Sequence, residues 1–454
     1  METTASSQDR TKDKLMYVVM TTLALSAMSV LMFSLVLPQI RDEFSVTNAQ
    51  VSWVTSAYTL IYGIGTVIYG KLADRFKLKN LLTFGLLLFA AGSVVGLTAQ
   101  AFWMVLAGRV IQAMGAASIP ATAMLIPLRY ISPERRGAAL GTAFMGLAIG
   151  SALGPVLSAF VLSALHWKWL FCFPFLLLFT LPFYRKYLDN DEVAPGKLDW
   201  LGGGLLAATV TFFMLAVTTS TAWYVIGGVI ALTLFIARIR SFAFPFVAPG
   251  LFRNTKYTLT LTIAFLISGI GFSVHFLSPL MLAQVNELSP AWIGFALVPG
   301  AVVSAIFGRK GGKIADKRGN AYLLYIAGAL MITCFALLST LIGAPAPFIA
   351  LILILGHVGS TFAMIAMSNA ASLTLSKELG GVGMGLLSMM NFIAGSMAAG
   401  AYGSFIDLEQ VKPWNPVNGF EGGAIYSNIF LVLVVACAVT VSIYYYFFRR
   451  NAAC

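Results

Sequence analysis

The feature that most constrains this chain is a succession of apolar stretches, each long enough to cross a lipid bilayer. A bilayer core of ~30 Å requires ~20 apolar residues in a helix. We identify fourteen such stretches, at residues 17–40, 51–72, 80–98, 102–126, 138–165, 169–184, 200–218, 222–238, 257–284, 292–312, 322–342, 348–375, 383–406 and 427–448. The seventh and eighth are joined by a tight turn near Ser220, so one re-entrant pair is the alternative for these two. The pattern predicts an all-α polytopic membrane protein whose first stretch is an uncleaved span.

The composition excludes several other classes of protein. Of the 454 residues, 59% are hydrophobic and 10% are charged, whereas about a quarter of the residues of an average soluble domain are charged. So few charges could not cover a water-soluble globule, and they also exclude a disordered chain and a nucleic-acid-binding domain. The four cysteines form no CxxC pair, so we predict neither a zinc site nor a disulfide framework.

Lysine and arginine are distributed unevenly between alternate loops. With the N-terminus placed in the cytoplasm, 25 of the 29 Lys and Arg residues face that side. Three face the other side, namely Arg41, Lys168 and Lys412, and Arg109 lies within a span. Because cytoplasmic loops carry the excess of positive charge, this pattern predicts an even number of spans with both termini in the cytoplasm. The net charge of +12 is therefore an orientation signal.

A short motif occurs twice, in equivalent places. The loop after the second stretch begins Gly70-Lys71-Leu72-Ala73-Asp74, and the loop after the tenth begins Gly312-Lys313-Ile314-Ala315-Asp316, 242 residues later. Each loop follows the second span of a six-span set, which predicts two parallel six-helix halves of the kind found in secondary transporters. The predicted divisions are an N-terminal half at 1–187, a linker with two extra transmembrane helices at 188–250, and a C-terminal half at 251–454.

Both repeats place an acid among bases near helix ends. Carboxylates beside helix N-termini and basic side chains form favourable contacts, so we predict a cytoplasmic ionic latch that holds one access state. The alternative is that each acid only shapes a turn in a basic loop. The latch residues that we predict are Asp74, Arg75, Lys77, Asp316, Lys317 and Arg318.

These motifs resemble those of the major facilitator superfamily, in particular its fourteen-span drug:proton antiporter branch, which includes the Gram-positive tetracycline efflux proteins. The first loop matches the superfamily's loop motif except that Phe76 replaces the usual glycine. The fourth span carries a stretch similar to the membrane-arginine motif, from Arg109 through Gln112 to Ala117. The fifth resembles the antiporter motif at Gly146, Gly150, Gly154 and Pro155.

The resemblance implies two six-helix bundles plus two inserted helices, fourteen spans in all, in the cytoplasmic membrane of a bacterium. It also implies multidrug efflux by a monomer working by alternating access, with the lipid bilayer and a small-molecule substrate as partners. No cofactor is expected, and a proton gradient is the expected energy source. No loop is long enough to hold an ATPase, and no set of residues typical of an intramembrane enzyme is found.

Several residues inside the spans are candidates for substrate or proton binding. A charge within the hydrocarbon costs ~3 kcal/mol on insertion scales and usually has a function, which selects Arg109. Gln112 lies at i+3, on the same helix face. His275 and His357 carry imidazoles, which titrate near neutral pH, and the resemblance places their spans along the central cavity. The remaining candidates are Asn391 and Asp407. A bracing role for Arg109, and a packing role for each histidine, are the alternatives.

The chain departs from the resemblance in its acids. The tetracycline-type relatives carry membrane carboxylates in spans 1, 5 and 13, where this chain has Val30, Ser151 and Gly395. Three interpretations remain open. Asp407 or a histidine carries the proton, the protein is an uncoupled facilitator, or Arg109 serves an anionic, zwitterionic or lipid-like substrate.

Overall fold

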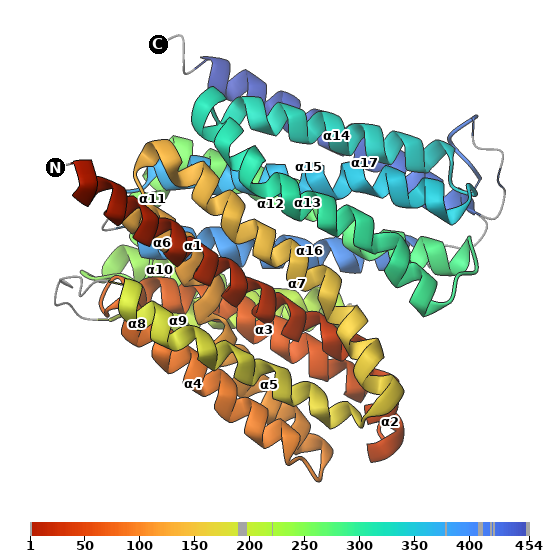
Figure 1. Cartoon of the computed structure of the whole chain (residues 1–454), viewed down its shortest axis with the longest axis horizontal. Coiled ribbons are helices and arrows are strands. Elements are labelled where there is room, and N and C mark those ends of the chain that lie inside the picture. The colour runs from red at the N-terminus through yellow and green to blue at the C-terminus, as the bar shows by residue number, and fades with distance from the viewer. Residues whose placement is uncertain are drawn as a thin grey trace. The chain divides into compact units, whose positions relative to one another are not determined.

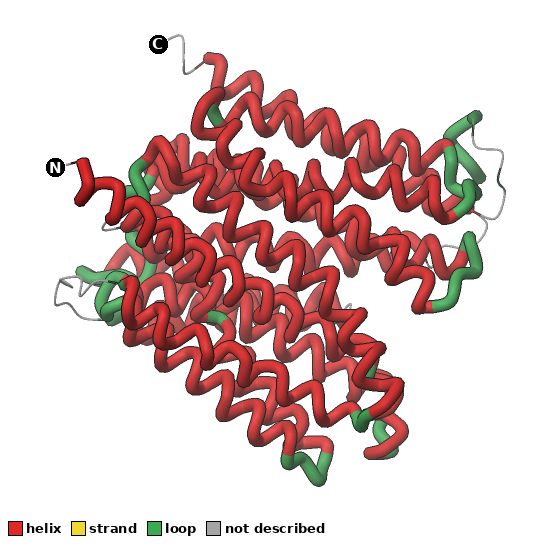
Figure 2. Tube along the Cα trace, in the orientation of Figure 1, coloured by secondary structure: helices red, strands yellow, loops and turns green. Residues whose placement is uncertain are grey.

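The computed structural model describes residues 2–188, 198–219, 221–376, 379–406, 412–417, 420 and 423–450. In this part of the chain the regular structure is entirely helical (Figures 1 and 2). The helices up to the predicted linker are α1 (Glu2–Leu31), η1 (Met32–Leu35), α2 (Leu37–Phe44), α3 (Asn48–Ala73), α4 (Leu78–Leu97), α5 (Phe102–Ala116), α6 (Ser118–Tyr130), η2 (Pro133–Arg135), α7 (Arg136–Ala164), η3 (Trp167–Thr180) and α8 (Leu181–Tyr187). Those that follow are α9 (Trp200–Thr219), α10 (Ala222–Ser241), α11 (Gly250–Arg253), α12 (Thr255–Gln284), α13 (Pro290–Arg318), α14 (Asn320–Thr340), α15 (Ala346–Thr374), α16 (Gly380–Ile406) and α17 (Ala424–Arg450).

Thirteen helical segments of the described chain are long and apolar enough to cross a membrane, and Trp200–Ala216 is a shorter apolar helix. Thirteen of the fourteen predicted stretches thus have a helix that meets both conditions. The shorter segment belongs to the seventh stretch, so the count of fourteen spans stays a prediction. Because α9 and α10 each contain 20 residues, and a helix rises 1.5 Å per residue, each is about as long as a bilayer core is thick.

The fourth predicted span is two helices rather than one. Helix α5 ends at Ala116 and α6 begins at Ser118. Pro120 has no N–H to donate to the carbonyl of Ala116 four residues earlier, which accounts for the break at that place. The apolar segment continues to Tyr130, four residues beyond the predicted end at 126.

Contacts divide the chain into two compact units. The first comprises Met1–Ser132, Ile149–Thr258 and Ala371–Phe392, and the second comprises Pro133–Ala148, Leu259–Ala370 and Ile393–Cys454. Each unit therefore contains helical segments from both predicted six-helix halves. The division into those halves stays a prediction.

Close helix packing in the first unit depends on glycine. A Cβ atom at Gly108 of α5 would lie 2.7 Å from the backbone nitrogen of Gly96 in α4. One at Gly115 would lie 2.3 Å from the backbone nitrogen of Phe89. Small residues let helix backbones approach one another in a membrane, where dispersion contacts drive helix association. These glycines therefore allow α4 and α5 to pack backbone against backbone.

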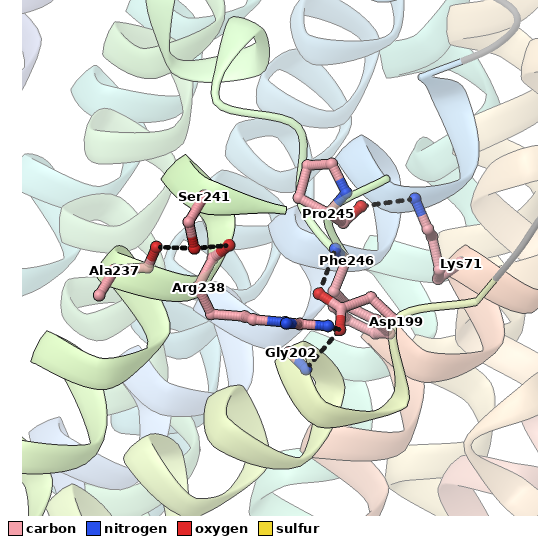
Figure 3. A network of polar contacts seen from close by, with 8 residues as sticks. All are labelled: Lys71, Asp199, Gly202, Ala237, Arg238, Ser241, Pro245 and Phe246. Atoms are coloured by element: carbon pink, nitrogen blue, oxygen red, sulfur yellow. Dashed lines mark hydrogen bonds and ion pairs between the residues drawn. The ribbon is translucent and has the colours of Figure 1, made fainter. Parts of the chain in front are cut away.

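Helices α9 and α10, which the sequence predicts to be an insertion, are anchored by one buried acid, Asp199, just before α9 (Figure 3). Asp199 Oδ1 accepts hydrogen bonds from the backbone N–H of Gly202 at 3.0 Å and from Arg238 Nε and Nη2 at 3.2 and 3.1 Å. Its Oδ2 accepts from the backbone N–H of Phe246 at 3.3 Å. The acid thus joins the start of α9, the end of α10 and the chain that follows.

The same chain segment is tied to the first repeat motif. Lys71 Nζ donates to the carbonyl oxygen of Pro245 at 3.3 Å (Figure 3). Lys71 belongs to the last turn of α3 and lies three residues before Asp74. The chain segment that follows α10 therefore contacts the end of α3, next to the loop in which we predict a latch.

Candidate functional site

Arg109 is fully buried on α5, between two aromatic rings. Its side chain is 0% exposed, and Cζ lies 4.2 Å from the centroid of the Phe33 ring and 3.9 Å from that of the Tyr58 ring. Arg109 Nε also donates to the carbonyl oxygen of Val54 at 3.2 Å. Cation–π contacts of this kind stabilise a desolvated cation by about 2 kcal/mol, so the rings and the carbonyl partly replace water around the guanidinium.

A hydrogen-bonded chain joins Arg109 to the neighbouring helix. Arg109 Nη1 donates to Gln112 Oε1 at 3.0 Å, and Gln112 Nε2 donates to Ser93 Oγ at 2.8 Å. Gly92 makes room for this chain, since a Cβ atom there would lie 2.4 Å from the backbone nitrogen of Gln112. Arg109 and Gln112 therefore share a helix face and act as one polar unit.

The Arg109 guanidinium retains an unused donor. Among the described residues, Arg109 Nη2 has no hydrogen-bond partner. The hydroxyls of Tyr58 and Ser29 lie next to each other and are buried near it. A buried arginine usually has a paired anion, and the first unit shows no carboxylate on Arg109 among its described contacts. The Arg109 cluster, which comprises Arg109, Gln112, Ser93, Tyr58 and Ser29, can therefore donate a hydrogen bond from Arg109 Nη2 to an anionic or strongly polar oxygen from outside the chain.

The first repeat acid contacts the start of a helix from the other half. Asp74 Oδ1 accepts hydrogen bonds from the backbone N–H of Gly381, at the N-terminus of α16, at 3.1 Å and from Arg129 Nη2 at 3.3 Å. Arg129 also donates to the carbonyl oxygen of Ala73 at 2.8 Å. Burial raises the pKa of Asp74 from 3.8 to about 6, although Arg129, Lys71 and the backbone N–H groups oppose this rise.

The second repeat acid makes the equivalent contact. Asp316 Oδ1 accepts from the backbone N–H of Gly137 at 2.7 Å, and Oδ2 accepts from that of Ala138 at 2.8 Å, both at the N-terminus of α7. The bases next to it in the sequence point elsewhere. Arg318 Nη1 donates to the hydroxyl of Tyr322 at 2.7 Å, and Lys317 is exposed.

Glycines on both sides make these two contacts sterically possible. A Cβ atom at Gly381 would lie 2.1 Å from Asp74 Oδ1, and one at Gly137 would lie 2.6 Å from Asp316 Oδ1. Each acid lies in a chain segment from one predicted half and the helix start in a segment from the other. Sequence reasoning missed Gly137, Gly381 and Arg129. The pairs Gly137/Gly141 and Gly381/Gly385, spaced four residues apart after each basic loop, are the signal that it overlooked.

The remaining predicted latch residues have less defined places. Arg75 is half-buried in the loop after α3, and Lys77 precedes the first residue of α4. Arg129, which lies at the end of α6, is the base that pairs with Asp74. The role of this whole set as a latch stays a prediction.

Two glycines of the antiporter motif, Gly150 and Gly154, face α1. A Cβ atom at Gly150 would lie 2.1 Å from the carbonyl oxygen of Ala24, and one at Gly154 would lie 3.1 Å from that of Met28. Gly146 is buried on the same helix, and Pro155 lies within α7. Gly150 and Gly154 therefore let α7 approach α1 closely.

The other site candidates lie on α12, α15 and α16. His275 and His357 form a ring pair in the second unit, with centroids 4.7 Å apart. Asn391 is half-buried on α16, in the part that belongs to the first unit. Asp407 lies outside the described residues. The structure thus brings together Arg109 with Gln112, and His275 with His357, as two separate clusters.

Comparison with known proteins identifies the family. The sequence matches the Major Facilitator Superfamily over residues 19–399. It is 28% identical over 322 residues to the lincomycin resistance protein LmrB of Bacillus subtilis strain 168, and this alignment covers 66% of this chain and 65% of that protein. It is 26% identical over 437 residues to the lincomycin resistance protein LmrB of Listeria monocytogenes serovar 1/2a, which covers 89% of this chain and 90% of that protein.

Two solved structures share the fold. The human organic anion transporter MFSD10 (TETRAN) aligns with a TM-score of 0.67 at 16% identity, covering 94% of this chain and 99% of that one. The proton:xylose symporter XylE aligns with a TM-score of 0.63 at 15% identity, covering 94% and 95%. The chain therefore belongs to the major facilitator superfamily and is a secondary transporter.

Proposed function

We propose that this chain exports small amphipathic compounds across the cytoplasmic membrane of a bacterium by alternating access. The names of the lincomycin resistance relatives, which align with up to 89% of the chain, support export. Transport rather than catalysis is the proposed activity, by a monomer with both termini in the cytoplasm. The proton gradient is the proposed energy source, with no bound cofactor.

The observation that carries this proposal is the duplicated aspartate contact. Asp74 accepts hydrogen bonds at the start of α16, and Asp316 accepts them at the start of α7. By the distribution of positive charge, both lie at the cytoplasmic side. Contacts that join segments of the two predicted halves on one side can form and break as that side closes and opens. Two such contacts in repeat-related places favour a rocking transporter.

Efflux from cells tests the proposal directly. Bacteria that express the chain are loaded with lincomycin, and accumulation is compared with and without an uncoupler of the proton gradient. We expect lower accumulation in expressing cells, restored to the control level by the uncoupler. Equal accumulation in expressing and control cells, repeated with a cationic dye as a second probe, would count against export of this class of compound.

A second candidate function is export of an anionic or zwitterionic metabolite. The buried Arg109 guanidinium, whose Nη2 has no described hydrogen-bond partner, favours it. Charge-assisted hydrogen bonds to a carboxylate or phosphate are stronger than neutral ones, and Lys lacks the planar fork that makes two of them. In proteoliposomes, Arg109→Lys should then weaken binding of an anionic probe about tenfold or more while leaving a cationic probe unaffected. Equal effects on both probes would indicate a bracing role instead.

A further inference from the structure

Two of the chain's three histidines form a contact that neither latch nor the Arg109 cluster uses. His275 of α12 and His357 of α15 lie edge to face, with ring centroids 4.7 Å apart and planes at 80°. His357 is 6% exposed, and its Nε2 has no hydrogen-bond partner among the described residues. His275 is exposed at the surface of the same unit. The pair therefore joins a buried nitrogen without a described partner to an imidazole on the outside of the unit.

The surrounding backbone is shaped around these rings. A Cβ atom at Gly300 of α13 would lie 2.4 Å from His357 Cδ2, so only glycine leaves room for the imidazole. The carbonyl of Gly271, one turn before His275, lies beside the His275 ring as an acceptor. A buried polar atom without a partner costs about 1–3 kcal/mol. An apolar side chain at position 357 would avoid this penalty, so a role in packing alone does not explain the histidine.

Few other ionisable groups face the pair. Two titratable side chains lie nearby, the Cys334 thiol of α14, which packs against Gly356, and Tyr402 of α16, whose hydroxyl donates to the carbonyl oxygen of Gly269. The charged residues described on α12 to α16 and the loop after α12 are nine or more positions along the chain from His275, His357 or Gly300, namely Lys256, Glu287, Arg309, Lys310, Lys313, Asp316, Lys317 and Arg318. No described carboxylate acts electrostatically on either imidazole, and His275 itself is the titratable group that acts on His357.

We propose that His275 and His357 together bind one proton and form the coupling site of the transporter, an inference that rests on the proposed proton antiport. A proton that arrives at this site binds first to the His275 ring, which is exposed on α12. The N–H bond on His275 then breaks as one forms at the unpaired nitrogen of His357, so the pair carries one positive charge and needs no other reactant. A hydrogen bond between an imidazolium and an imidazole is charge-assisted and strong. The pair thus supplies the ionisable group that Val30, Ser151 and Gly395 do not.

The first test needs no substrate. Because the chain contains only three histidines, the purified protein labelled with ¹⁵N-histidine has three imidazoles to follow by NMR as the pH changes. If one proton is shared, His275→Gln should move the titration midpoint of His357 by about one pH unit or more. His166→Gln should leave both unchanged, since His166 lies near Glu43 in the first unit. Independent titration of His275 and His357 would overturn the proposal, whatever the transport activity.

The second test separates coupling from substrate translocation. Proteoliposomes with lincomycin as probe are assayed for exchange without a pH gradient and for probe-driven proton movement reported by a trapped pH dye. His275→Gln and His357→Gln should each reduce proton movement more than tenfold and leave exchange within about twofold, and His166→Gln should change neither. Retained proton movement in His357→Gln overturns the histidine site. Exchange without proton movement in the unmodified protein overturns it too but leaves the exporter intact, whereas loss of exchange there contradicts the proposed function itself.

Discussion

The contact between Gly137 and Gly312 yields the sharpest prediction. A Cβ atom at Gly312 would lie 2.0 Å from the carbonyl oxygen of Gly137, 2.4 Å from its carbonyl carbon and 2.7 Å from the Cα atom of Ala138. All three are backbone atoms, so no side chain can rotate away. Ordinary van der Waals contact begins at 3.4 Å, so Gly312→Ala must push α7 and α13 apart by roughly 1 Å.

That displacement breaks the hydrogen bonds of Asp316. They are 2.7 and 2.8 Å long in the structure, and hydrogen bonds to a charged group contribute about 1.5–3 kcal/mol each. Asp316 is half-buried, so water replaces part of these hydrogen bonds when they break. We therefore expect the contact to lose roughly 3 kcal/mol of its free energy of formation. At 1.36 kcal/mol per factor of ten, the ratio of closed to open contact should fall by about 150-fold.

Amide hydrogen exchange measures this ratio at the contact. The N–H groups of Gly137 and Ala138 are the donors to Asp316, so their exchange should accelerate by about the same 150-fold in Gly312→Ala. The matched control is Gly294→Ala in the same helix, because a Cβ atom at Gly294 meets nothing within 4 Å. If the two variants exchange at the same rate, the aspartate contact does not hold the helices together and the reasoning is wrong.

Two further predictions concern Asp74 and Asp199. The pKa of Asp74 is about 6 in its contact with Gly381, against an ordinary value of 3.8. Protonation of Asp74 therefore stabilises the formed contact. This stabilisation is complete below pH 3.8 and is lost as the pH rises through 6. Protection of the Gly381 amide, corrected for intrinsic exchange, should therefore fall between pH 5 and pH 7.5, and Asp74→Asn should abolish this dependence; a rise with pH would refute it. Asp199→Ala leaves Arg238 without its buried partner, so we expect the free energy of unfolding to fall by roughly 2–3 kcal/mol. This is less than for a fully buried pair, because the Arg238 side chain is 28% exposed. Thermal unfolding in detergent measures it, and Arg240→Gln, at an exposed position of the same helix, should change the midpoint little.

The helices were predictable because their signal is simple. Apolar runs of about 20 residues must form helices in a bilayer, since each backbone group needs a partner within its own segment. The break near Ala117 was less apparent, because Pro120 lies in a run that is mostly apolar and long enough to read as one span. Periodicity does not reveal such local irregularities, although proline chemistry does.

The partners of the site residues were harder to predict. The pairing of Arg109 with Gln112 follows from their i, i+3 spacing on one helix. Asp74 instead contacts Gly381, which lies 307 positions later in the sequence, and its base comes from the end of α6 rather than from its own loop. A contact between distant backbone segments leaves no trace in charge or hydropathy, and the glycine pair Gly381/Gly385 was its one overlooked sign in the sequence.

The glycine-lined aspartate contacts have a consequence for how readily they reverse. Ordering a long side chain on contact formation costs up to about 2 kcal/mol of rotamer entropy, whereas glycine has none to lose. At Gly137 against Gly312, and at Gly70 against Gly381, backbone meets backbone with no side chain between. Little conformational freedom is frozen when these surfaces meet or regained when they part. The conformational entropy should therefore change little from one state to the other, which suits a contact that must form and break in every transport cycle.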